Sequence, residues 1–311
     1  MSEPAVVTET LARVSVAGLD EILGVRLPVL DDGFVRLVDY MGSDESIVQA
    51  ARVSYGSGTK RVSEDRALIR YLMRHHHSTP FEMCEIKLHV RVPMDCWRQW
   101  IRHRTASVNE YSTRYSLAID NAQTTGASEW RRQTIANRQG SDELLDAEIG
   151  SYLSQREHQL TVLAREVYEE RIAADVAREQ ARKDLPLSTY TEAYWKIDLH
   201  NLFHFLRLRM DSHAQDEIRQ FATTIGHKIV AKWCPIAWDA FIDYHVESLE
   251  LSKIERRVVS LLSDGNSDAA IAELESLGLL SRTATGFSRN RERIELEAKL
   301  RKLSIAIPWA E

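Results

Sequence analysis

Residues 98–114 read RQWIRHRTASVNEYSTR, and this stretch says most about what the chain can do. It holds four arginines against one carboxylate, so its local charge is 4 − 1 = +3 in a chain whose net charge is −6. Arginine forks pair with phosphate oxygens and with planar carbonyl or imide edges. The short side chains after the arginines let backbone amides approach a ligand. A solvated basic surface is the alternative, but polar residues on both sides of Arg102-His103-Arg104 favour a site for an anionic ligand.

Glu110 is the single carboxylate of this stretch, and phosphate binding alone does not explain it. It could be the ion-pair partner of a neighbouring arginine. It could also accept a hydrogen bond from a ribose hydroxyl or from a ring N–H. The sequence leaves these roles open.

The composition excludes several classes of protein. The chain has 311 residues with 46 acidic and 40 basic side chains, which argues against a sequence-independent nucleic-acid binder. An apolar fraction of 44% with 28% charged residues is typical of a globular protein. No apolar run approaches the roughly 18 residues of a membrane span, and residues 1–23 lack the features of a secretion signal. We therefore expect a cytoplasmic protein that binds neither nucleic acid nor membrane.

The three cysteines, Cys84, Cys96 and Cys234, are an odd number and form no CxxC pair. This pattern argues against a disulfide scaffold and fits a reducing cytoplasm. None lies in an evident nucleophile context, and we expect Cys96 and Cys234 in the core.

The segment from Cys84 to Val92 alternates apolar and polar side chains, which predicts a half-buried strand. Pro93 ends that strand and suits the start of a helix that we expect to run to about Arg104. Glycine and proline are scarce, at 13 and 7, so most of the chain should be regular and mostly helical. The expected fold is a helix-rich α+β subunit with a small, mostly antiparallel sheet.

Apolar spacing, caps and breakers place the remaining elements. We expect a short strand at 34–38, helices from Asp44, from Ser63 to Arg74, over 142–183, from about Asp198, after a capping box at 212–215 and over 236–248, and irregular structure at 105–140. The expected organisation is a lead-in over 1–32, a catalytic domain over 33–250 and a helical extension over 251–311.

Two histidine groups lie outside the arginine-rich stretch. His75-His76-His77 precedes Ser78-Thr79-Pro80, and His200 and His204 are one helical turn apart. Either group could suggest a metal ion. Adjacent histidines rarely chelate one ion, so a turn that places an imidazole and Thr79 against a ligand is the better interpretation. No metal site is therefore expected.

The residues Arg102-His103-Arg104, Ser107, Asn109, Glu110, Ser112 and Arg114 match the pattern RHRxxSxNExSxR. In this the chain resembles the flavin-dependent thymidylate synthases. The resemblance spans about residues 33–248 and also includes Ala51–Ser54, His77–Glu82, Arg98-Gln99-Trp100, Arg182 with Leu185-Pro186, and Arg209 to Gln215.

The resemblance implies a methyltransferase that converts dUMP to dTMP by reductive methylation. Methylenetetrahydrofolate would supply the carbon and FAD, reduced by NADPH, would supply the hydride. The resemblance also implies a homotetramer with active sites shared between subunits. The residues implied for FAD are Ser54, His77, Thr79, Arg102, His103, Arg104, Glu110, Asp198, His200 and His204. Those implied for dUMP are Gln99, Arg102, Glu110, Tyr111, Ser112, Thr113, Arg114, Arg182 and Arg209.

Arg209 is the residue implied for catalysis. A fixed cation beside an imide stabilises the anion that forms there, which would activate carbon 5 of uracil. Among the residues implied for FAD, Asp198 has the wrong charge for a contact with the diphosphate, because a carboxylate repels phosphate groups. The competing hypotheses are flavin- and folate-dependent methylation of uracil in RNA, a nucleic-acid-binding module without enzymatic activity, and a helical metalloprotein.

Overall fold

The computed structural model describes residues 13–53, 62–112, 121–133, 141–283 and 286–309. Within it the chain divides into two compact units, Met1–Val246 and Glu247–Glu311, which are described separately. Ser54, Thr113 and Arg114, all implied above as ligand-binding residues, lie outside the described residues.

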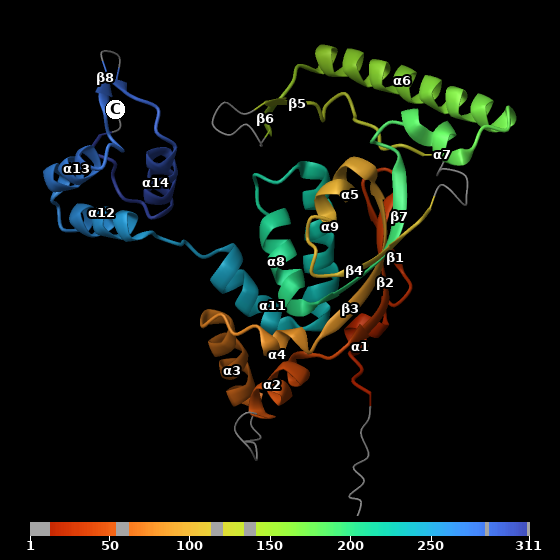
Figure 1. The fold of residues 1–311 in the computed structure, drawn as a ribbon. Coiled ribbons are helices and arrows are strands. Elements are labelled where there is room, and N and C mark those ends of the chain that lie inside the picture. Colours follow the sequence, from red (N-terminus) through yellow and green to blue (C-terminus); the bar gives the residue numbers. More distant parts are fainter. Residues whose placement is uncertain (1–12, 54–61, 113–120, 134–140, 284–285, 310–311) are drawn as a thin grey trace, which may run out of the picture. The chain divides into compact units, whose positions relative to one another are not determined.

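A five-stranded sheet is the centre of the first unit (Figure 1). Its order is β1-β2-β3-β7-β4 and every neighbouring pair is antiparallel. The strands are β1 (Arg26–Val29), β2 (Gly33–Met41), β3 (Glu85–Pro93), β4 (Ser107–Glu110) and β7 (Tyr190–Asp198). The expected helix-rich α+β fold with a small antiparallel sheet is confirmed.

Three helices cover one face of this sheet (Figure 1). They are α5 (Met94–Trp100), α8 (Leu199–Arg209) and α9 (Asp216–Ile225). The alternation in β3 buries Ile86, Leu88 and Val90 against these helices and leaves the residues between them half-exposed. The three helices are therefore held at fixed positions over the sheet, and the ends of α5 and α8 carry the candidate site.

A second group of helices packs beside the sheet. It comprises α2 (Asp44–Val53), α3 (Val62–Arg74), α4 (Thr79–Glu82), α10 (Ala231–Trp233) and α11 (Pro235–Phe241), with π-helical turns at Gly226–Val230 and Ile242–Val246. The unit also contains α1 (Ala17–Asp20), the hairpin β5 (Arg131–Gln133) and β6 (Ser141–Leu144), α6 (Ala147–Ala173), α7 (Arg178–Ala181) and the 3-10 turn Arg182–Asp184.

Several sequence expectations were right. The strand expected at 84–92 is β3, and the helices expected from Asp44, up to Arg74 and from Asp198 are α2, α3 and α8. Alternation and helical caps carried these predictions, since both depend only on local residues.

Other expectations were wrong. The helix after Pro93 ends at Trp100 instead of Arg104, and β6 replaces the first turns of the helix expected over 142–183. The segment 105–140, expected to be irregular, contributes β4 and β5, and β7 was not predicted at all. β4 and β5 are short and polar, so they give little signal of their own and form because a neighbouring strand pairs with them.

The segment before residue 33 is also more ordered than expected, because α1 and β1 lie there and β1 pairs with β2. The predicted capping box at 212–215 is wrong as well. The N-cap of α9 is Gln215, whose side chain makes no capping hydrogen bond.

Asp44 joins the N-terminal ends of two helices. Its two carboxylate oxygens accept from the backbone N–H groups of Ile236 and Ala237, at 2.8 and 3.0 Å, and so cap α11 from the first turn of α2. Burial raises the pKa of Asp44 to about 6, although the two N–H donors favour the charged form.

The raised pKa of Asp44 predicts a pH-dependent stability. Between about pH 4 and 6 the folded state binds more protons at this group than the unfolded state, so its contribution to stability falls as pH rises. Asp44→Asn cannot titrate, and the gap in unfolding free energy between wild type and this variant should narrow as pH rises through that range. Denaturant unfolding at several pH values measures the gap, and a constant gap would contradict the prediction.

The second unit has its own small core. It contains α12 (Lys253–Ser263), α13 (Ser267–Ser276), the hairpin β8 (Arg282–Thr283) and β9 (Gly286–Phe287), and α14 (Arg291–Lys302). Leu274, Leu296 and Leu300 are buried between the helices, and Ser252 and Glu255 form a capping box at the start of α12. In neither unit do the described residues include a helix long and apolar enough to cross a membrane.

Candidate active site

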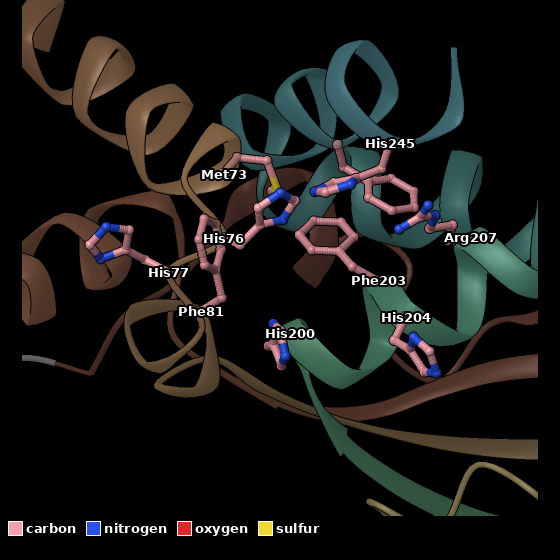
Figure 2. A pocket seen from close by; sticks show the side chains of 10 residues that line it. Met73, His76, His77, Phe81, His200, Phe203, His204, Arg207 and His245 are labelled. Atoms are coloured by element: carbon pink, nitrogen blue, oxygen red, sulfur yellow. The ribbon is translucent and has the colours of Figure 1, made fainter. Parts of the chain in front are cut away.

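One face of α8 lines a pocket of about 150 Å³ (Figure 2). His200, Phe203, His204 and Arg207 have the spacing i, i+3, i+4 and i+7, which brings them onto one side of the helix. The whole pocket is called the histidine pocket below. The helix begins directly after β7, so the sheet fixes where these side chains lie.

The other walls of the histidine pocket come from around the turn between α3 and α4 and from the end of α11 and the segment after it. His76 and His77 belong to that turn and Phe81 to α4 itself. Phe241 is the last residue of α11 and His245 lies in the π-helical turn after it, and Met73 of α3 completes the lining. His76 has a backbone φ of 56°, a left-handed conformation that reverses the chain after α3. Phe203 and Phe241 stack with ring centroids 4.4 Å apart. The pocket therefore combines aromatic surface with imidazoles and one arginine.

A cluster of polar groups adjoins the histidine pocket, where the ends of α5 and α8 meet. Arg209 donates from Nε to His103 Nε2 at 3.1 Å and from one Nη to the backbone carbonyl of Gln99 at 3.4 Å. The ring of His103 lies 5.7 Å from that of His204, which lines the pocket. The cluster therefore lies directly beside the wall of the pocket that His204 forms.

His103 is neutral at physiological pH. Burial lowers its pKa to about 4, and the positive charge of Arg209 lowers it further in the same direction. Because a guanidinium can only donate, Nε2 of His103 must accept, which leaves the imidazole proton on Nδ1. Protonation of His103 would break its bond to Arg209.

Among the described residues, no carboxylate compensates the charge of Arg209. Arg209 is half-buried, and its partners in that part of the chain are a neutral imidazole and a carbonyl. Burial lowers its pKa from the ordinary value for arginine, but arginine remains protonated. A half-buried cation without a counterion is suited to stabilise negative charge on a ligand.

Glu110 is the last residue of β4 and accepts a hydrogen bond from the hydroxyl of Thr191 in β7, at 3.0 Å. In the described part of the chain it forms no ion pair with an arginine, so the salt-bridge explanation of Glu110 is not supported. Tyr111 follows, and its backbone N–H donates to the carbonyl of Glu192 at 2.8 Å. Ser112 comes next and is half-buried.

The remaining candidates are not drawn into this cluster. Arg102 and Arg104 lie in the exposed loop after α5, and among the described residues neither forms an ion pair. Thr79 is the exposed first residue of α4. Arg182 lies in the 3-10 turn beyond α6 and α7 and does not line the histidine pocket.

Asp198 has a structural role. It is the N-cap of α8, accepting from the backbone N–H of Asn201 at 2.9 Å and from the Asn201 side chain at 2.7 Å. A helix N-terminus attracts an anion through its free N–H groups, and Asp198 already occupies one of them. The cap explains this carboxylate without any contact to a ligand phosphate.

Two substitutions at Asp198 separate the cap from a ligand contact. Asparagine also caps helices, so Asp198→Asn should leave both stability and flavin affinity close to wild type. Asp198→Ala removes the cap and should cost about 1 kcal/mol of stability. Denaturant unfolding and flavin titration measure the two effects. A large change in flavin affinity in Asp198→Asn would show that the carboxylate contacts the cofactor.

Seven residues of the histidine pocket were not assigned a role from the sequence, namely Met73, His76, Phe81, Phe203, Arg207, Phe241 and His245, although His76 belongs to the histidine run noted above. Arg207 had a usable signal, because it continues the helical face that starts at His200 and His204. His245 had none, since its element is distant in sequence. Despite the number of imidazoles, no group of three or more metal-ligating side chains in the described residues is placed to hold a metal ion.

These features define a helix-rich α+β subunit with a site for a small anionic ligand. A family model described as thymidylate synthase complementing protein matches residues 36–236, and the chain belongs to that family. The resemblance seen in the sequence is thereby confirmed.

Curated relatives agree with this assignment. A protein of Wolbachia pipientis wMel named flavin-dependent thymidylate synthase is 50% identical over 259 residues, covering 83% of this chain and 91% of its own. One of the same name from Dictyostelium discoideum is 51% identical over 239 residues, covering 73% of this chain and 77% of its own.

Solved structures give a similar picture. The UMP/dUMP methylase PolB from Streptomyces cacaoi, bound with 5-Br dUMP, has a TM-score of 0.63 and 30% sequence identity, covering 70% of this chain and 98% of that one. Its complex with 5-Br UMP has a TM-score of 0.64 and 31% identity, covering 71% of this chain and 98% of that one.

Proposed function

We propose that the chain is a flavin-dependent thymidylate synthase that methylates dUMP reductively to dTMP. Methylenetetrahydrofolate donates the one-carbon unit and NADPH reduces the flavin. Membership of the family and the names of its relatives support this activity. The observation that carries it in the structure is Arg209, a half-buried cation held by neutral His103 and the Gln99 carbonyl.

The histidine pocket fits part of an FAD molecule. Phe81 and Phe203, both almost fully buried, form apolar parts of the pocket wall, while His77, His204 and Arg207 carry polar groups that would donate to a diphosphate or a ring edge. Bound and reduced, FAD supplies the hydride of the reaction. The residues of this chain would hold the cofactor and orient it.

At the substrate, Arg209 would donate to a uracil oxygen and stabilise the negative charge that forms when the ring nitrogen N3 loses its proton. Gln99, Arg102, Glu110, Tyr111 and Ser112 lie within the segment 99–112, from the end of α5 to just after β4, and would bind the nucleotide. None of the three cysteines would act as a nucleophile, because all are buried and the burial raises the pKa of Cys96 and Cys234.

The size of the pocket supports a shared active site. Pockets for drug-sized ligands enclose roughly 300–1,000 Å³, whereas the histidine pocket of one chain has about 150 Å³. FAD and dUMP together need more. The homotetramer that the resemblance implies would supply the missing walls, including Arg182 from another subunit. Tyr152, Leu160 and Leu163 of α6 are exposed apolar residues that such an assembly would cover.

Purified protein tests this function directly. It should be yellow, or take up FAD on reconstitution, and should release tritium from dUMP labelled at carbon 5 when methylenetetrahydrofolate and NADPH are added. A colourless protein that cannot be reconstituted would overturn the proposal. Size-exclusion chromatography with light scattering would test the tetramer, and fractionation of the source cells would test a cytoplasmic location.

A second candidate substrate is UMP, because the similar PolB structures are of a UMP/dUMP methylase. The same assay with UMP, dUMP and tRNA as methyl acceptors separates the possibilities. Turnover with dUMP alone supports the proposal. Turnover with tRNA alone would favour an RNA methylase, the alternative that the sequence left open.

A further inference from the structure

Gln215 lies between two residues of α5, one of which is the candidate substrate residue Gln99. Asp95 and Gln99 are four residues apart and lie on one face of that helix. Gln215, the N-cap of α9, donates from Nε2 to Asp95 Oδ2 at 3.0 Å and accepts from Gln99 Nε2 at Oε1. All three side chains are half-buried.

The chemistry of these groups fixes the direction of each hydrogen bond. An ionised carboxylate only accepts, so the end of Gln215 that faces Asp95 must be its NH₂ group. The amide oxygen of Gln215 then faces Gln99, and the end of Gln99 that faces it must also be an NH₂ group. A terminal amide alone could flip by 180° with almost no change of shape. Asp95 fixes the orientation of the Gln215 amide, and Gln215 in turn fixes the orientation of the Gln99 amide.

Gln99, the last residue in this chain of hydrogen bonds, lies at the candidate site. The backbone carbonyl of Gln99 accepts from Arg209, so the main chain and the side chain of Gln99 are both held. Within the described residues, the Gln99 amide keeps its oxygen and one N–H for a ligand. A ligand that meets a pre-oriented amide loses less free energy in ordering it.

We propose that Asp95 and Gln215 are positioning residues that fix the orientation of the Gln99 amide for the nucleotide substrate. The inference rests on the proposed function, since it assumes that Gln99 binds dUMP. Asp95 and Gln215 act through Gln99 and not on the substrate. Their loss should therefore raise KM for dUMP and leave kcat with bound substrate largely intact.

A pair of substitutions tests the direction of the hydrogen bonds. Gln215→Glu places a carboxylate against Asp95 and should raise KM for dUMP roughly fivefold to tenfold, the value of one hydrogen bond. Asp95→Asn leaves both amides free to flip and should raise KM less. In the double variant, the new amide at position 95 can donate to the new carboxylate at position 215, which can still accept from Gln99. The double variant should recover most of the lost affinity.

Gln220→Glu is the matched control. Gln220 lies on α9 and donates to Asp216 at 2.7 Å, so this change places a carboxylate against an aspartate on the same helix without touching Gln99. It should leave KM for dUMP unchanged. In a Gln99→Ala background, Gln215→Glu should add little to KM, because the group it positions is gone.

Two results would overturn the inference: Gln215→Glu raising KM no more than Gln220→Glu, or the double variant failing to recover. If Gln215→Glu does not fold, the KM values of Asp95→Asn and of the double variant are compared with wild type instead. If the wild-type enzyme binds dUMP and the variants have the same KM for dUMP, only the positioning role is wrong. A wild-type protein that neither binds nor methylates dUMP removes the proposed function as well.

Discussion

Arg209→Ala is expected to lower dTMP formation by roughly 10²- to 10³-fold, the usual effect of removing one hydrogen-bond donor from a site where negative charge develops. The reason is the environment of Arg209. Its partners among the described residues are His103 and a carbonyl, and neither neutralises its charge. Its half-buried position reduces screening by water. Single-turnover measurement with pre-reduced enzyme isolates the step that Arg209 should assist.

The same substitution has an independent spectroscopic consequence. The charge of Arg209 is one cause of the low pKa of His103, second to burial. Removing that charge should raise the pKa of His103 above about 4, although burial should keep it below the ordinary value of about 6.5. Titration of the imidazole by NMR reports this shift whether or not the enzyme is active.

Arg219→Ala serves as the control for Arg209→Ala. Arg219 is a half-buried arginine on α9 that pairs with Asp216, away from the histidine pocket. Its loss should change stability slightly and leave the rate unaffected. Full turnover in Arg209→Ala, with flavin bound, would remove Arg209 from catalysis.

The parts of the fold that the sequence predicted are those decided by local pattern. The alternation around Leu88 identifies β3, and the cap Asp198 marks the start of α8. β4 could not be predicted, because its four residues are all exposed and its pairing with β7 depends on a partner about 85 positions away. Periodicity contains no information about such a partner.

In the candidate site, too, local sequence patterns could be predicted and contacts between distant segments could not. The signature around Arg102-His103-Arg104 identified the family, yet of these three only His103 bonds to Arg209 in the structure. That contact joins residues 106 positions apart and needs the tertiary fold. The resemblance assigns Asp198 to the flavin, which stays a prediction, and the structure shows in addition that this carboxylate caps α8. The type of a residue indicates which chemistry its side chain can perform, but the residues that contact it in the folded structure determine which role it takes.

Trp100→Ala is expected to destabilise the first unit by about 3–5 kcal/mol, the usual cost of removing a buried tryptophan. Trp100 is 0% exposed, and its ring centroid lies 4.9 Å from Phe205 and 5.1 Å from Trp195. It therefore joins α5, α8 and strand β7 at one point. The loop that carries His103 begins directly after it, so loss of the ring should also weaken dUMP binding in the protein that remains folded.

Trp100→Phe distinguishes packing from hydrogen bonding. Among the described residues the indole N–H of Trp100 has no hydrogen-bond partner, so phenylalanine gives up only volume and should cost less than half as much as alanine. Leu277→Ala, at an exposed position in the second unit, should stay within about 0.5 kcal/mol of wild type. Denaturant unfolding of the FAD-loaded protein at fixed concentration compares the three. Equal losses in Trp100→Phe and Trp100→Ala would mean that an interaction of the indole, and not the filling of this junction, holds the helices to the sheet.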